Sequence, residues 1–398
     1  MISFGSLCLL LPLAMLMGSA ASGDRGSIKI PKVTYRSGIY TLVLDGQSAY
    51  ARGFQHGKAL SFAIKLGLRN FKRWIQASTG IVDSEQMLQE FISKTGYLQS
   101  AQGHAPDLVE EMQGIAAGAG VDLQELFCYQ SFDELTLYLL QTGMLTLAAD
   151  HCTCTGLYGR QGKPNLLSHN NDMPTYHEGL GTVLHIRVPD SDLEILQGTF
   201  AGQIGQNGVN NRGLAVGMNT ILDLPLSEEG VPASFHVRRL LECEDRHAAI
   251  AYLKTQSFGT AMNYIIGDRE KIVTVETWED NVVVLDHFPD QIVAHTNHTL
   301  QQDAPVTIDV QAGEGGPSLA LTHERLDLAL DALTADPEGM MLEDLIQLKR
   351  TAPILYQSDD PPARTLMSMI VEIPREGDPL MYTTPDSPDG CEHVKFEF

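Results

Sequence analysis

A strand–turn–strand unit that begins at a cysteine constrains the fold of this chain more than any other feature. Strands are predicted at residues 154–158 and 165–169, with a Gly-Lys-Pro turn at 162–164 between them. Such a hairpin brings the end of its second strand back beside the start of its first. Asp172 follows Cys154 by 18 residues (172 − 154), so we expect its carboxylate to lie near the thiol.

The pattern of apolar residues changes at this hairpin. Over most of residues 41–145 the apolar positions recur three and four apart, which predicts a mainly helical N-terminal segment. Beyond the hairpin, strands are expected at 182–188, 193–197, 214–218, 263–267, 272–276, 281–286, 292–295 and 366–373, and helices at 234–255, 318–335 and 342–350. Helices around long antiparallel hairpins indicate one α+β layered domain.

Composition excludes some classes of partner. The chain has 398 residues, 43% of them hydrophobic, which is enough for one large core. Its formal net charge of −23 repels nucleic acid and anionic lipid, so neither is expected as a partner. Residues 1–23, an apolar run followed by small residues, are typical of a secretory signal peptide. We therefore expect a secreted, periplasmic or lumenal protein, and no later apolar run is long enough to span a membrane.

The cysteine count points to one thiol with a function. The chain has six cysteines, and Cys8 would leave with the signal peptide. An odd number in a secreted protein suggests a free reactive thiol, with up to two disulfides among the others. Those others can equally be reduced and buried, and the sequence does not decide between the two.

Residues 150–155 place Cys152 and Cys154 beside an Asp and a His, which allows three interpretations. The first is half of a zinc site completed by His295 and His298, although no Cys-x-x-Cys pair accompanies it. The second is a structural pair of buried thiols. The third is a nucleophile at the start of a strand. A Cys-His-Asp triad is disfavoured, because a His three residues before Cys154 in an extended chain points to the opposite face.

A nucleophile at a strand start makes definite chemical demands. A Cys at a new N-terminus carries an α-amino group with an ordinary pKa of about 7.7–8.0, which can act as general base without a His. The chain must first be cut: the thiol attacks the preceding carbonyl, here that of Thr153, and water opens the resulting thioester. A carboxylate must hold the amine, and amide donors must stabilise the oxyanion.

At these residues the sequence resembles the autoproteolytic penicillin acyl-coenzyme A acyltransferase family (isopenicillin N acyltransferase-like), which belongs to the N-terminal-nucleophile (Ntn) hydrolases. The Cys-Thr strand at 154–158 and the Asn-x-Asp ending at 170–172 resemble the hairpin of that family. Further segments resembling its signatures follow one another in the same order, at 53–58, 111–120, 208–219 and 295–298.

The resemblance implies a fold and a set of roles. The fold is a four-layer αββα sandwich with a helical N-terminal prosegment. Residues 24–153 would form a small chain and 154–398 a large one, the cut falling between Thr153 and Cys154. Cys154 matches the nucleophile, Asp172 the carboxylate that holds its amine, and Asn297 the amide of the oxyanion site.

Several positions leave alternatives open. Cys152 also precedes a Thr, so the cut could fall there, although the spacing to Asp172 favours Cys154. His169 stands where the acid ceramidase branch has an Arg. Arg325 and Arg364 are both candidates to complete the site, and a solvated surface position is the alternative for each. The glycosylation sequon at 297–299 conflicts with a buried oxyanion residue.

The function expected is amide hydrolysis, or acyl transfer, on a small-molecule amide through a thioester, without metal or cofactor. Hydrolysis is favoured, because water is always present and an extracellular site has little acyl-coenzyme A. An acyl-coenzyme A-dependent acyltransferase of the same fold is the nearest alternative. A secreted binding protein that stays uncut, with Cys152 or Cys154 in a disulfide, and a zinc hydrolase are the rivals from other classes.

Overall fold

The computed structural model describes residues 28–145, 152–285, 288, 292–307, 319–359 and 362–398. The predicted signal peptide at 1–23, together with Asp150 and His151, lies outside the described residues.

Two sheets form the centre of the fold. In sheet A, neighbouring strands are antiparallel except for the parallel pair β2 and β5. Its order is β1 (Thr34–Arg36), β2 (Ile39–Leu44), β5 (Gly181–Arg187), β6 (Glu194–Phe200), β7 (Asn207–Asn210), β8 (Ala215–Thr220), β9 (Met262–Gly267), β10 (Ile272–Trp278) and β11 (Asn281–Leu285). Sheet B is antiparallel, in the order β12 (Ile292–His295), β3 (Thr153–Leu157), β4 (Asn165–Pro174), β14 (Pro362–Ile373), β15 (Leu380–Thr383) and β16 (Val394–Phe396), with β13 (Gln357–Asp359) beside β14.

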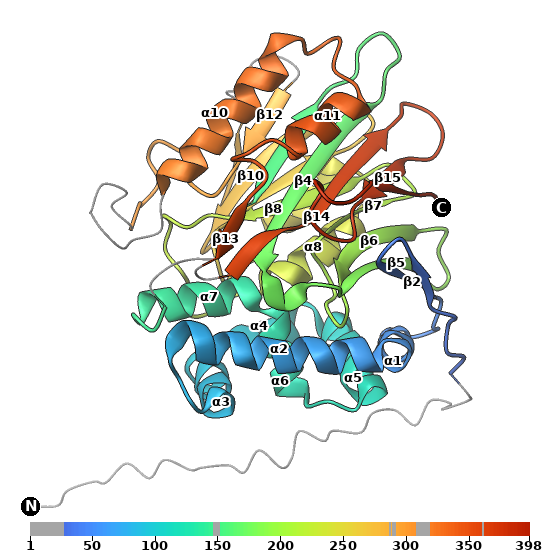
Figure 1. Ribbon diagram of the computed structural model, residues 1–398. Coiled ribbons are helices and arrows are strands. Elements are labelled where there is room, and N and C mark those ends of the chain that lie inside the picture. Colours follow the sequence, from blue (N-terminus) through green and yellow to red (C-terminus); the bar gives the residue numbers. More distant parts are fainter. Residues whose placement is uncertain (1–27, 146–151, 286–287, 289–291, 308–318, 360–361) are drawn as a thin grey trace, which may run out of the picture.

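The sheets pack face to face between two helical layers (Figure 1). Leu167 and Met369 of sheet B share one buried cluster with Val183 and Ile265 of sheet A. Outside sheet B lie α10 (Leu319–Ala335) and α11 (Leu342–Lys349), and α8 (Ala233–Leu241) and α9 (Arg246–Leu253) pack on sheet A. The predicted four-layer αββα sandwich is therefore confirmed.

A helical segment precedes the hairpin, as predicted, and occupies the lower part of Figure 1. It comprises α1 (Ala49–Ala59), α2 (Ser61–Thr79), α3 (Ser84–Lys94), α4 (Tyr97–His104), α5 (Pro106–Ala119), α6 (Leu123–Gln130) and α7 (Phe132–Gln141). Side chains cap several of these helices: Asp83, for example, accepts from the backbone of Gln86. Within the described part of the chain, no helix is both long and apolar enough to cross a bilayer.

Helices α1 and α5 approach so closely that only glycine fits between them. A Cβ atom added to Gly57 would stand 2.1 Å from the carbonyl oxygen of Ile115, and one added to Gly114 would stand 2.2 Å from that of Tyr50. Because both obstacles are backbone atoms, a larger residue can be accommodated only if the helices separate.

We expect Gly57→Ala to lower the free energy of unfolding by about 3 kcal/mol, at the upper end of overpacking costs, because it forces α1 away from α5. Gly103 in α4 is the matched control, since a Cβ there meets nothing within 4 Å. Gly103→Ala should be neutral or stabilise by up to about 1 kcal/mol. Urea denaturation of both variants measures the difference, and equal midpoints would refute the close-packing argument.

Candidate active site

The chain around Cys152 is held by side chains from three distant parts of the sequence. Strand β3 begins at Thr153, so Cys152 stands just ahead of it. The backbone N–H of Cys152 donates to Asn297 Oδ1 at 2.9 Å, and Arg325 Nη1 donates to the carbonyl of Cys152 at 2.6 Å. Lys349 Nζ donates to the carbonyl of Thr153 at 2.9 Å. Three main-chain polar groups of two neighbouring residues are thus fixed by buried polar side chains.

A cavity of about 10 Å³ lies beside Cys152, enough for about one water molecule. Its wall combines two carboxylates, two amides, a hydroxyl and three thioethers. These come from α7, β4, β8, β9 and the loop before β7: Asp133, Asn171, Asp172, Met173, Gln206, Met218, Thr220 and Met262. The thiol of Cys152 therefore shares an enclosed space with the predicted amine-holding carboxylate.

Asp172 is one of the two carboxylates that line this cavity. Its Oδ1 accepts from the hydroxyl of Thr365, and its Oδ2 is buried with no hydrogen-bond partner among the described residues. Burial raises the pKa of Asp172 to about 7, against the lowering effects of Arg325, Thr365 and Lys349. A buried oxygen of this kind is free to accept one further hydrogen bond.

Asn297 is fully buried, and its side chain is oriented by three contacts. Oδ1 accepts from Cys152 and from Arg325 Nη2 at 2.8 Å, while Nδ2 donates to the carbonyl of Thr220 at 3.0 Å. The amide oxygen, and not the nitrogen, thus faces Cys152. Because Asn297 is inaccessible in the folded chain, its sequon is not a surface glycosylation site.

A buried carboxylate fixes the loop that carries Asn297. Glu276 on β10 accepts from His295 Nε2 at 2.8 Å, from the hydroxyl of Thr299 at 2.6 Å and from the backbone of Leu300 at 2.6 Å. These contacts flank Asn297 on both sides, so the loop cannot move without breaking them. Nothing in the sequence pattern singled out Glu276, which looks like an ordinary strand residue.

Cys154 lies deeper, between the sheets. Its side chain is fully buried in a cluster that includes Leu167, Ile272 and Val293, and Sγ is 3.8 Å from the carbonyl of Met218. Burial raises the pKa of the Cys154 thiol to about 12, although Lys349 and a hydrogen bond from Asn219 lower it. An un-ionised thiol in apolar packing is a poor nucleophile.

The two arginine candidates differ in burial and in their partners. Arg325 on α10 is fully buried and contacts both Cys152 and Asn297, so the surface alternative is wrong for it. Arg364 instead pairs with Glu178 and Asp386 at 3.1 Å on a partly exposed part of the structure. Lys349, at the end of α11, was missed by sequence reasoning, because a Lys in the last turn of a helix is usually solvated.

The histidines considered for zinc have other partners. His295 binds Glu276 and the carbonyl of Thr296, and His298 stacks on His323 with ring centroids 3.7 Å apart. In the portion of the chain covered by the structure, no group of three or more His, Cys, Asp or Glu side chains is placed to hold a metal.

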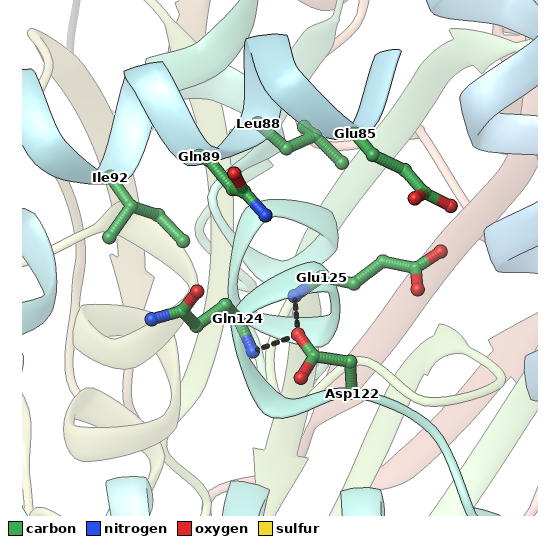
Figure 2. Close-up of a pocket in the computed structure, with 7 residues that line it drawn as sticks. All are labelled: Glu85, Leu88, Gln89, Ile92, Asp122, Gln124 and Glu125. Carbon is green, nitrogen blue, oxygen red and sulfur yellow. Dashed lines mark hydrogen bonds between the residues drawn. The ribbon is translucent and has the colours of Figure 1, made fainter. Parts of the chain in front are cut away.

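A larger pocket, of about 190 Å³, lies between α3 and α6 (Figure 2). It is lined by Glu85, Leu88, Gln89, Ile92, Asp122, Gln124 and Glu125. Asp122 caps α6 by accepting from the backbone of Gln124 and Glu125, as the dashed lines in Figure 2 show. Its lining includes no thiol, hydroxyl or imidazole, so the pocket offers no nucleophile beside a base.

The chain matches one family model over part of its length and is similar to solved structures, two of which are described below. Residues 159–313 match the family described as acyl-coenzyme A:6-aminopenicillanic acid acyl-transferase, a span that contains Asp172 and Asn297. A variant of conjugated bile acid hydrolase from Clostridium perfringens is 14% identical, with a TM-score of 0.41 over 62% of this chain and 97% of that one. Penicillin V acylase from Agrobacterium tumefaciens is 12% identical, with a TM-score of 0.36 over 58% of this chain and 82% of that one.

The family match begins just after β3 and ends after the loop of Asn297, so it covers the return strand of the hairpin and most of sheet A. The fold around it has the two packed sheets and outer helices expected of an Ntn hydrolase. Through residues 159–313, the chain is similar to the acyl-coenzyme A:6-aminopenicillanic acid acyl-transferase family, whose description is that of enzymes that transfer acyl groups.

Proposed function

We propose that the chain is an autoproteolytic cysteine amidohydrolase whose cut falls before Cys152, and that Cys152 then carries the acyl group as a thioester. One observation carries the proposal. The backbone nitrogen of Cys152 is bound by Asn297, and Cys152 lines the same small cavity as Asp172, whose Oδ2 has no hydrogen-bond partner among the described residues. One group that would hold a new α-amino group therefore already binds this nitrogen in the uncut chain, and a second lines the cavity beside the same residue.

The proposed cut proceeds in the following steps. The Cys152 thiol attacks the carbonyl carbon of the preceding residue, the C–N bond breaks, and the thiol proton goes to the nitrogen, which becomes the α-amino group. Water then opens the thioester and frees the thiol. Asn297 Oδ1 keeps one N–H of the new amine, and Asp172 Oδ2 accepts another.

In turnover the freed amine acts as general base. It takes the proton of the Cys152 thiol, which attacks the carbonyl of the substrate amide, and returns the proton to the leaving amine. Water resolves the thioester in a second step. A role for Asn297 as oxyanion donor stays a prediction, since its Nδ2 is bonded to Thr220 in the uncut chain.

The choice of Cys152 departs from the spacing argument for Cys154. Cys152 lines the cavity and keeps 7% of its surface exposed, whereas Cys154 is fully buried with its thiol pKa raised to about 12. One contact favours Cys154 as second candidate: Lys349 donates to the carbonyl of Thr153, which a Cys154 thiol would attack. If the cut falls before Cys154, Thr153 is the last residue of the small chain. If it falls before Cys152, Thr153 is the second residue of the large chain.

The proposed substrate is a small-molecule amide, and the proposed acceptor is water. Met173, Met218 and Met262 give the cavity a deformable apolar side suited to an acyl chain. Secretion, as the signal-peptide pattern predicts, belongs to the same proposal, because little acyl-coenzyme A is present outside the cell. The small and large chains would remain together as one enzyme.

Purified protein on a denaturing gel, with mass spectrometry of the N-termini, tests the proposal. We expect two chains, the larger beginning at Cys152. A larger chain beginning at Cys154 would move the nucleophile to that residue and keep the mechanism. A single intact chain that still hydrolyses amides would refute autoproteolysis.

A further inference from the structure

Lys349 is a fully buried lysine at the end of α11, and its ammonium reaches into the site described above. Its Nζ donates to the carbonyl of Thr153, one residue beyond Cys152. Asn170 on β4 fixes the end of this helix, since its Nδ2 donates to the carbonyl of Lys349 at 3.0 Å and to that of Ile354 at 3.2 Å. The position of the ammonium is therefore set by the same hairpin that carries the site.

The groups facing this ammonium come from every element packed around it. The two thiols of Cys152 and Cys154 lie on the β3 side, and His169 and Asp172 lie on β4. Arg325 on α10 and His393 before β16 complete the list. Burying an ammonium is costly unless its charge is compensated, and here the groups able to compensate it are the carboxyl and the two thiols.

We propose that Lys349 is a positioning residue of the Cys152 site: its ammonium holds the carbonyl of Thr153 and places a buried positive charge near the thiol of Cys152 and the carboxyl of Asp172, where it favours the negatively charged forms of both groups. The inference rests on the proposed function and adds a residue to it. Without this cation, the first residues of β3 would lose a buried anchor at the moment when the cut frees their N-terminal end.

The pKa shifts of Lys349 and Asp172 are consistent with this position of the ammonium. Burial lowers the pKa of Lys349 to about 8, while Cys154, Asp172 and Cys152 raise it, so the side chain is charged at pH 7. Lys349 is one of three groups that lower the pKa of Asp172 against burial. Removing the cation should therefore raise the pH at which the acidic groups of the site ionise.

The test measures how fast iodoacetamide alkylates Cys152 as a function of pH, with the product located by mass spectrometry. This readout needs no substrate and can be made on cut or uncut protein. We expect the midpoint of the profile to move up by about one pH unit in Lys349→Met, the shift typical of losing a nearby opposite charge. Lys349→Gln, which keeps a donor for the Thr153 carbonyl but no charge, should show the same shift and serves if the Met variant does not fold.

Two control variants distinguish the loss of the Lys349 charge from a loss of packing in the same helix. Leu345→Ala removes a buried side chain of the same helix and should lower the melting temperature without moving the midpoint. Lys349→Arg restores the charge and should return the midpoint toward that of the wild type. An unshifted midpoint in a folded Lys349→Gln protein would overturn the inference and leave a chain starting at Cys152 untouched. A wild-type chain that is never cut would instead refute the proposed function, whatever the midpoints.

Discussion

Replacing Cys152 with alanine is expected to leave the chain in one piece and to reduce amide hydrolysis by a factor on the order of a thousand or more. The reason is that one thiol would perform both reactions, the cut and the turnover. Cys152→Ala leaves Asn297, Arg325 and Lys349 their main-chain partners, because all three bind backbone atoms around residue 152. The variant should therefore fold like the wild type.

Cys154→Ala is the matched control, two residues further along the chain. It removes a buried sulfur from the inter-sheet cluster, which should cost about 1 kcal/mol of stability but leave the chain cut and active. Cutting is followed on a denaturing gel, and hydrolysis on a panel of acyl 4-nitroanilides. If Cys154→Ala stays uncut while Cys152→Ala is processed normally, the nucleophile is Cys154, as the spacing to Asp172 predicts.

The sequence could not decide between these cysteines for a geometric reason. Residues two apart in a strand point to the same face, so no alternation pattern distinguishes Cys152 from Cys154. They differ in depth: Cys152 lines the small cavity, whereas Cys154 is buried in the cluster between the two sheets. That depends on β12, β8 and α10, which pack around the strand start from 60 or more residues away.

Local patterns predicted several elements closely, short ones included. Strand β12 has the predicted bounds, and the hairpin of β3 and β4 has the predicted turn. The predicted helix at 234–255 is instead two helices. Asn210, from a distant strand, donates to the carbonyls of Leu241 and Cys243, and Asp245 caps the next helix. Periodicity alone continues through such a break because the interrupting partner lies elsewhere in the sequence.

Site residues were predictable only where a motif carried them. Asp172 and Asn297 came from the hairpin ending and the His-Thr-Asn-His element, and both lie around Cys152. Lys349 and Thr153 are 196 residues apart, and neither has a neighbour in sequence that marks the contact. The two arginines that the sequence left as alternatives, Arg325 and Arg364, were separable only by burial, which tertiary packing decides.

A buried ion pair joins the helical segment to the rest of the sandwich. Glu111 on α5 accepts from Arg238 on α8 at 3.1 and 3.4 Å, and Arg52 on α1 lies 3.6 Å from the same carboxylate. Glu111 and Arg238 are almost completely inaccessible. Because α5 precedes the proposed cut and α8 follows it, this pair would link the two chains of the processed enzyme.

Glu111→Met is therefore expected to lower the free energy of unfolding by about 3–5 kcal/mol, since among the described residues it leaves Glu242 as the carboxylate partner of the buried Arg238 guanidinium. The double variant with Arg238→Met should recover most of that loss, because an apolar pair of similar volume replaces the two charges. Urea unfolding in the Cys152→Ala background keeps both segments in one chain, so each transition is unimolecular. A loss below about 1 kcal/mol in Glu111→Met would contradict this account. The two segments would then be held by their other contacts, such as the packing of Phe127 against Phe235 and the ion pair of Arg239 with Asp107.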